Sequence, residues 1–176
     1  MDELTRLLLD AADGDRLALS TFIRRTQADV WRFCAHLVDP QAADDLTQEV
    51  YLRAMRTIPQ FRGDASARTW LLRVTRNVAA DEIRRRQRRR KLPEPEPGVT
   101  GDDSGLIALR ELVTSLPKER QEAFVLTQIL GLSYQHAAEA CDVPVGTIRS
   151  RVSRAREQLI GLVEDADNDV RNDEDS

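Results

Sequence analysis

The sequence predicts an all-α protein made of two small helical domains that a flexible linker joins. Strong helix formers such as Ala, Leu, Arg, Glu and Gln recur throughout the 176 residues, and runs of Val, Ile and Thr with a period of two are missing. Aromatic residues make up only 5% of the chain, which argues against one large aromatic-rich core. Each domain must therefore build its core from the apolar faces of amphipathic helices.

A segment rich in proline, glycine and acidic residues divides the chain. Residues 92–105 read LPEPEPGVTGDDSG. Proline fixes φ and removes a hydrogen-bond donor, glycine loosens the backbone, and the acids repel one another. We therefore expect an N-terminal domain over residues 1–91 and a flexible linker over residues 92–105. A C-terminal domain is expected over residues 106–163 and an acidic, disordered tail over residues 164–176.

Four helices are expected in the N-terminal domain. Apolar residues recur at helical spacing in four stretches, which Asp-Gly-Asp, Asp-Pro and other turn residues separate. Asp39-Pro40 is expected to stop the second helix, and Asp44 and Asp45 to open the third, because acidic residues suit the positive first turn of a helix. The expected helices cover about residues 4–11, 19–37, 44–58 and 66–90.

Residues 132–159 predict a helix-turn-helix in the C-terminal domain. Ser133 can cap a short helix over 134–141, and the next three residues leave room only for a tight turn. The helix that follows carries a buried stripe of Ile148, Val152, Ala155 and Leu159. Its outer face then carries arginines and small hydroxyl residues: Thr147, Arg149, Ser150, Arg151, Ser153, Arg154 and Arg156.

This outer face is suited to the major groove of DNA. Arginine matches guanine edges and phosphates, and serine or threonine lets a helix approach the bases closely. A solvated amphipathic helix is the plain alternative for an arginine-rich face. The short preceding helix, the three-residue turn and the small residues Ala137, Ala138 and Ala140 at the crossing favour DNA binding.

The charge distribution supports a nucleic-acid partner although the net charge is -4. Net charge governs solubility and long-range steering, whereas binding depends on where charges cluster. Residues 81–91 hold seven basic side chains against two acids, and the chain from residue 164 is almost purely acidic. The basic run is expected to follow phosphates with salt-sensitive affinity, or else to form a solubilising helix end.

Three segments resemble the extracytoplasmic-function (ECF) sigma factors, most closely the actinobacterial sigma-C type. The −35-reading segment of the family resembles LGLSYQHAAEACDVPVGTIRSRVSRAREQL. Its polymerase-binding helix resembles DDLTQEVYLRAM, and its −10-reading segment resembles FRGDASARTWLLRVTRNVAADEIRR. The segments occur in family order and the resemblance covers about residues 4–163. Asp142 stands where the family often has glycine, and aspartate can adopt the left-handed conformation of such a turn at some cost.

The resemblance implies a cytoplasmic sigma subunit that directs RNA polymerase to promoters. Its partners would be promoter DNA, core polymerase (the β′ clamp helices and the β flap) and an anti-sigma factor. On the third helix, Asp45, Gln48 and Glu49 would dock on the clamp helices, with Arg53 in support. The outer face of the last helix would read the −35 element.

The resemblance also implies a pocket for a flipped base of the −10 element. Phe61 would supply a ring for stacking, and Asn77 an amide that both donates and accepts hydrogen bonds. Phe61 could instead be a simple loop anchor, and Trp70, which follows the apolar stripe, is expected in the core. Backbone contacts are assigned to Arg73, Arg76 and Arg84.

No catalytic, metal or cofactor site is expected. Tetrahedral zinc requires four convergent ligands, and Cys34 with His36 or His136 with Cys141 are incomplete sets. A Gly-rich phosphate loop, a Ser-His-Asp arrangement, a signal peptide and a membrane span of about 20 apolar residues are not found in the sequence. A dimeric helix-turn-helix regulator remains the main alternative, and a nucleic-acid-processing enzyme a weaker one.

Overall fold

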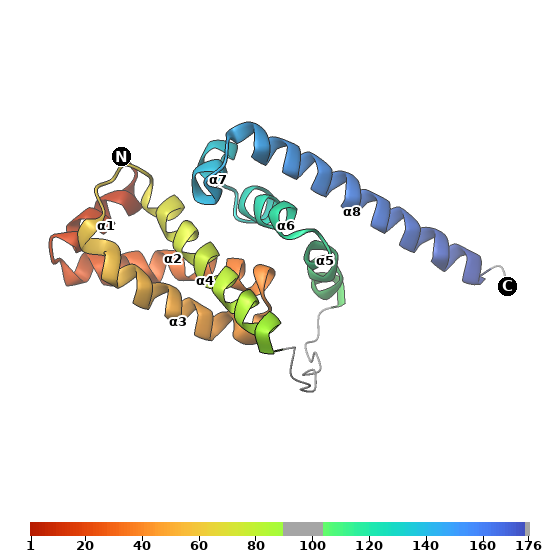
Figure 1. Cartoon of the computed structure of the whole chain (residues 1–176), viewed down its shortest axis with the longest axis horizontal. Helices are drawn as coiled ribbons and strands as arrows, with labels where there is room; N and C mark the ends of the chain where they lie inside the picture. Colours follow the sequence, from red (N-terminus) through yellow and green to blue (C-terminus); the bar gives the residue numbers. More distant parts are fainter. Residues whose placement is uncertain (90–103, 175–176) are drawn as a thin grey trace.

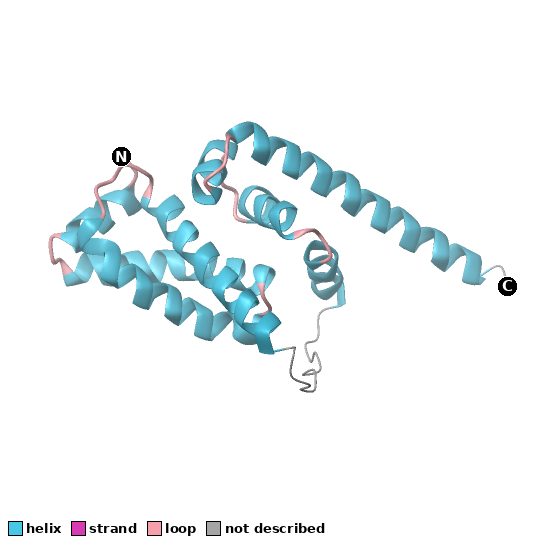
Figure 2. Ribbon diagram, in the orientation of Figure 1, coloured by secondary structure: helices cyan, strands magenta, loops and turns pink. Residues whose placement is uncertain are grey.

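The computed structural model describes residues 1–89 and 104–174, and both stretches are built from helices (Figures 1 and 2). Neither stretch contains a strand. The all-α prediction is therefore confirmed. Most of the predicted linker, from residue 92 to residue 103, lies outside the described residues.

The N-terminal domain is a bundle in which α2 packs against α1, α3 and α4. Fully buried side chains such as Leu8, Phe22, Val30, Val50 and Leu71 fill its core. The helices are α1 (Glu3–Ala12), α2 (Arg16–Leu37), α3 (Pro40–Thr57) and α4 (Ala67–Arg89), with a short 3₁₀ turn, η1 (Ile58–Gln60), after α3.

Aspartate side chains cap the first three helices. Asp2 accepts a hydrogen bond from the Thr5 amide at 3.0 Å, and Asp15 accepts from the Leu17 amide at 2.8 Å. Each carboxylate satisfies an N–H group that has no partner within its helix.

The predicted start of the third helix at Asp44 was wrong. α3 begins at Pro40, and Asp39 caps it by accepting from the Ala42 amide at 2.7 Å. Proline suits the first helical position because its missing N–H would be unsatisfied there in any case. The Asp-Pro pair therefore ends one helix and starts the next.

The C-terminal domain places a helix-turn-helix after two short helices. Its elements are α5 (Ser104–Thr114), α6 (Lys118–Phe124), a π-helical turn labelled η2 (Val125–Ile129), α7 (Tyr134–Cys141) and α8 (Val145–Glu174). Ser133 caps α7 by accepting from the His136 amide at 3.1 Å, and Asp142 has the left-handed φ of 56°. The predicted cap, turn and second helix are confirmed.

α8 is longer than the sequence analysis expected. The acidic segment from residue 164, expected to be disordered, continues the helix up to Glu174. No proline or glycine follows Gly161 to interrupt it. The end of α8 projects away from the rest of the domain (Figure 1).

The two domains share part of one apolar core. Phe33, Leu37, Leu72 and Ala79 of the N-terminal domain belong to the same buried cluster as the core residues of the C-terminal domain. α4 packs against α7, and α2 lies against α5 and α6. This arrangement places one side of α4 beneath the C-terminal domain (Figure 1).

Replacing Leu8 by alanine should destabilise the N-terminal domain. Leu8 is fully buried, so the Leu8→Ala variant loses apolar burial and leaves a cavity, which costs about 2–5 kcal/mol of unfolding free energy. Urea unfolding followed by circular dichroism measures the change. The control Leu17→Ala removes the same side chain from a position that is 74% exposed and should cost less than about 0.5 kcal/mol. Equal losses in the two variants would contradict the core assignment.

Candidate nucleic-acid interface

The helix-turn-helix presents the outer face of α8 to solvent. Ile148, Val152 and Ala155 are buried as predicted, whereas Leu159 is only partly buried. The alanines of α7 are buried too, which allows close packing of α7 on its neighbours. On the outer face, Thr147 and Arg151 are partly buried, and the exposed residues are Arg149, Ser150, Ser153, Arg154 and Arg156.

Two arginines of this face have the freedom that DNA binding requires. Arg149 and Arg154 are exposed and form no ion pair with any residue that the structure describes. Arg156 instead donates to the side chain of Gln128 at 2.5 Å, and Ser150 donates to the Thr147 carbonyl at 3.0 Å. Arg149 and Arg154 therefore keep the accessible guanidinium groups that the predicted base contacts need.

Of the predicted −10 residues, Arg73, Arg76, Asn77 and Arg84 lie on α4, whereas Phe61 directly follows η1. Arg73 and Asn77 are exposed, and Trp70 lies one turn before Arg73 and is partly buried. Phe61 is 7% exposed and packs against Trp70 with the ring centroids 5.5 Å apart. Trp70 packs against the core, as the sequence analysis expected, but it is only partly buried and so is more accessible than Phe61.

Two of the arginines assigned to the −10 element contact the C-terminal domain, although Arg73 stays exposed. Arg76 Nε donates to Glu122 Oε2 at 2.7 Å. Arg73 donates to the Glu139 carbonyl at 2.7 Å and lies 3.6 Å from the Asp142 carboxylate. Sequence spacing could not reveal these contacts, because they join residues more than 40 positions apart.

A groove of about 600 Å³ remains open where these two domains meet. Trp70 and Arg73 line it from α4, and Val143 and Pro144 from the turn of the helix-turn-helix. The exposed part of the Trp70 ring therefore faces the C-terminal domain across this groove.

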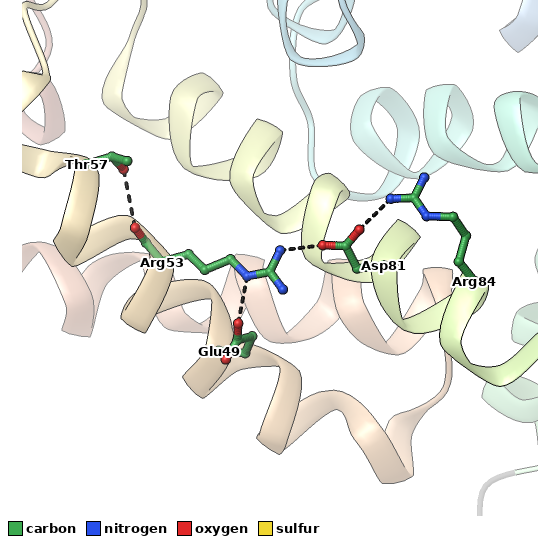
Figure 3. A network of polar contacts seen from close by, with 5 residues as sticks. All are labelled: Glu49, Arg53, Thr57, Asp81 and Arg84. Atoms are coloured by element: carbon green, nitrogen blue, oxygen red, sulfur yellow. Dashed lines mark hydrogen bonds and ion pairs between the residues drawn. The ribbon is translucent and has the colours of Figure 1, made fainter. Parts of the chain in front are cut away.

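The predicted polymerase-docking residues lie on α3. Asp45 and Gln48 are exposed, whereas Glu49 is engaged by Arg53 at 2.6 Å. Arg53 also pairs with Asp81 of α4 at 2.5 Å, and Asp81 pairs in turn with Arg84 (Figure 3). The hydrogen bonds from Arg53 and Arg84 lower the pKa of Asp81. Arg53 thus connects α3 to α4 and holds the side chain of Glu49, one of the predicted docking residues.

The sequence analysis missed two apolar residues beside this surface. Leu52 is 51% exposed and Met55 is 41% exposed. Together with Ile23, Gln48 and Tyr51 they line a shallow groove between α2 and α3. Both lie off the buried stripe of α3, which is the sequence signal that could have identified them as exposed.

The basic run at the end of α4 is partly neutralised by acids. Arg84 pairs with Asp81, and both Arg85 and Arg86 pair with Glu82. The arginines that follow, at positions 88 and 89, are exposed. Arg90 and Lys91 lie outside the described residues. Among the described residues of this run, Arg88 and Arg89 are therefore the exposed arginines that no ion pair engages.

The cysteines are structural side chains of the core. Burial raises the pKa of Cys34 to about 12 and that of Cys141 to about 11, so both thiols stay protonated at neutral pH. Across residues 1–89 and 104–174, no three His, Cys, Asp or Glu side chains are grouped to hold a metal ion. Among the helices of this described part, none has the length and apolar character needed to cross a membrane.

Comparison with known proteins decides the family. The model of sigma-70 region 2 matches residues 22–89, and that of sigma-70 region 4 matches residues 106–159. The ECF RNA polymerase sigma factor SigC of Mycobacterium tuberculosis is 47% identical over 174 residues, which cover 94% of each chain. The chain belongs to the ECF sigma factors. The ECF RNA polymerase sigma factor SigE of Mycolicibacterium smegmatis is 37% identical and covers 90% of this chain and 67% of that protein.

Solved structures of sigma factors share the fold. The sigma factor RpoE of Bartonella quintana, in complex with the anti-sigma factor NepR, has a TM-score of 0.72 at 25% identity, covering 83% of this chain and 96% of RpoE. CnrH, in complex with the cytosolic domain of CnrY, has a TM-score of 0.76 at 24% identity, covering 93% and 98%. The N-terminal domain is thus region 2 and the C-terminal domain region 4, and the resemblance stated from the motifs is confirmed.

Acidification should destabilise the folded chain through His36. Burial, and then the charge of Arg110, lowers the pKa of His36 below 6.5, and its Nδ1 is buried without a hydrogen-bond partner. The imidazole of His36 therefore binds a proton more readily in the unfolded chain than in the folded chain. The contribution of the neutral imidazole to the free energy of unfolding is complete above pH 6.5, and it is lost as the pH falls towards the pKa of His36 in the folded chain. Urea unfolding at about pH 7.5 and about pH 5.5 measures the loss.

The variant His36→Gln should lose less stability between these two pH values than the wild type. His136→Gln serves as the control because His136 is exposed. If His36→Gln retained the full wild-type pH dependence, another group would be responsible.

Proposed function

We propose that the chain is an alternative sigma subunit that docks on core RNA polymerase and leads it to promoters. The observation that carries this proposal is the match to both sigma-70 regions, in order, together with 47% identity to a SigC protein over 94% of the chain. A dimeric helix-turn-helix regulator is not favoured, since such a regulator would not need region 2. We assign no catalytic step to the chain, because polymerase performs the chemistry, and we place its action in the cytoplasm.

Docking on polymerase is assigned to α3. The surface offers exposed polar groups, Asp45 and Gln48, beside the exposed apolar side chains of Leu52 and Met55. Protein interfaces commonly combine an apolar centre with a polar rim. We assign this surface to the β′ clamp helices, with Glu49 held in place by Arg53, and region 4 to the β flap.

Reading of the −35 element is assigned to the outer face of α8. Its exposed arginines stand on a rigid helix whose opposite side is anchored by Ile148 and Val152. A recognition helix of this kind enters the major groove, where arginine distinguishes guanine from the other bases.

Opening of the −10 element is assigned to the face of α4. Extruding a base costs stacking energy of a few kcal/mol, which an aromatic ring and a hydrogen-bonding amide can offset. Asn77 supplies the amide at the surface, and Phe61 with the partly exposed Trp70 supplies the aromatic wall. Arg73, Arg76 and Arg84 would bind the phosphates once region 4 has moved. We also propose an anti-sigma factor as a partner, as for RpoE with NepR.

Run-off transcription with purified core polymerase tests the proposal. The chain should convert core enzyme into a promoter-specific initiator on genomic fragments, whereas a regulator would leave initiation dependent on another sigma subunit. In the same assay Arg149→Ala and Arg154→Ala should each weaken −35 recognition by about 1–3 kcal/mol, because each removes a bidentate donor. The exposed arginine of α1 provides the control variant Arg6→Ala, which should initiate normally. Normal initiation by all three variants would refute the role of the α8 face.

Asn77→Ala should impair promoter opening and leave −35 binding intact. The substitution removes the amide that reads the extruded base but does not touch α8, about 70 residues further along the chain. Permanganate reactivity of thymines near −10 measures opening, and gel retardation of −35 duplex measures binding. Wild-type permanganate reactivity would argue against the pocket.

A further inference from the structure

We infer that Thr5 of α1 is a positioning residue for promoter opening, because its hydroxyl holds the loop before α4 in the shape that reads the extruded base. The base-reading loop covers residues 61–66, between η1 and α4. The inference rests on the proposed opening of the −10 element by Phe61 and α4. It adds a residue of another helix that controls how well the −10 base is selected.

A hydrogen bond between a side chain and the backbone joins α1 to the start of α4. Thr5 Oγ1 accepts from the Ala67 amide at 3.0 Å, across 62 positions of the sequence, and both residues are buried. The N-terminal end of α1 and the base-reading loop lie side by side (Figure 1). The first N–H groups of a helix have no partner within it, and a buried N–H without a partner is costly. Thr5 therefore fixes the end of the loop to α1.

The carboxylate of Asp2 sets the direction of the Thr5 hydroxyl. Thr5 Oγ1 donates to Asp2 Oδ2 at 2.6 Å, and the Thr5 amide donates to Asp2 Oδ1 at 3.0 Å. Burial raises the pKa of Asp2, but the hydrogen bonds from Thr5 outweigh burial and lower the pKa overall. An ionised carboxylate can only accept hydrogen bonds. The hydroxyl hydrogen therefore points to Asp2, and a lone pair of the oxygen is left for the Ala67 amide.

The rest of the loop alternates between anchored and exposed residues. Phe61 is 7% exposed and belongs to the core of region 2. Gly63 has a φ of 79°, and a Cβ at this position would lie 3.6 Å from Leu9 Cδ1 of α1. Arg62 and Asp64 are exposed. The contacts with α1 thus determine which loop side chains remain accessible to DNA.

A displaced loop should harm base selection more than binding. Extruding a base has a cost that the loop and α4 can offset only while their groups keep their positions. A misplacement of about 1 Å in a reacting or binding group can cost about 100-fold in rate. Docking through α3 and −35 reading through α8 use other surfaces. Loss of the Thr5 contact should therefore reduce opening and weaken the preference for the correct −10 base, with both binding steps unchanged.

Three variants of the full chain test the role of the hydroxyl. Thr5→Val keeps the shape of the side chain but removes the acceptor for the Ala67 amide, whereas Thr5→Ser keeps that acceptor. Thr26→Val is the matched control for the loss of a buried hydroxyl. Thr26 is 2% exposed, and its Oγ1 donates to the Phe22 carbonyl at 2.8 Å and not to the base-reading loop.

The measurements separate loop position from general stability. Urea unfolding gives the stability of each variant, and hydrogen exchange followed by NMR gives the protection of the Ala67 amide. With core polymerase, permanganate reactivity gives the opening of a promoter fragment from which the wild type initiates in run-off transcription. The same fragment with single substitutions in its −10 element gives the ratio of opening between correct and altered bases.

We expect Thr5→Val to lose the protection of the Ala67 amide and to open the parental promoter about tenfold less than the wild type. Its opening ratio should fall towards one, because a misplaced loop reads correct and altered bases alike. Thr5→Ser should stay within about twofold of the wild type in both quantities. Thr26→Val should lose stability but keep the protection of the Ala67 amide, the opening and the ratio.

Three results would overturn the inference. A folded Thr5→Val variant with the wild-type opening ratio would show that the contact does not position the loop. A Thr5→Ser variant as impaired as Thr5→Val would show that the hydroxyl is not the cause. An equal loss of the ratio in Thr26→Val would assign the effect to general stability.

Asp2→Ala replaces Thr5→Val if that variant does not fold, as judged by circular dichroism. It leaves Thr5 in place but removes the carboxylate that holds its hydroxyl. Asp15→Ala, which removes the cap of α2, is its control. The opening ratio should fall at least about threefold in Asp2→Ala alone, and an unchanged ratio would overturn the inference. Failure of the proposed function is recognised separately, since the wild type itself would then open no promoter with core polymerase.

Discussion

The burial of α4 on two sides is the constraint on which the rest of the structure depends. Leu71 and Val78 pack into the core of region 2, whereas Leu72 and Ala79 belong to the core shared with region 4. A helix with apolar groups on two sides has little surface left for polar function. Arg73 and Asn77 therefore lie on the side of α4 that neither core covers, which is where the −10-reading residues are proposed to lie.

Much of the fold could be predicted because its signals are local. Ser133, the turn at Asp142 and the apolar stripe of α8 are neighbours in sequence and fold as expected. The start of α3 was missed because Asp-Pro suits both the end of one helix and the beginning of another, and Asp39 acts as a cap. The length of α8 was missed because acidic composition suggested disorder, although no helix-breaking residue follows Gly161.

The candidate site was predicted less completely, for a physical reason. Residue type and spacing identify which side of a helix is polar, and this sufficed to predict that Arg149 and Arg154 are exposed. They do not show which distant group satisfies a polar side chain, so the pairing of Arg76 with Glu122 and of Arg53 with Asp81 required the folded chain. Exposed apolar residues such as Leu52 and Met55 escape a search for charge, and only their position off the buried stripe of α3 separates them from the core.

The π-helical turn before the recognition unit has a consequence for how region 4 evolves and can be redesigned. In residues 125–129 the Leu130 amide bonds to the Val125 carbonyl, five positions back, so this turn holds one residue more than an α-helical turn would. Deleting a single residue there would restore α-helical winding, and because the wider turn takes up its extra residue within one turn, the segments that follow would keep nearly the same rotation about the helix axis. A related chain that lacks the extra residue could therefore present the same side of its recognition helix to a duplex, so the length of this turn can change by one residue while the approach of the last two helices is kept.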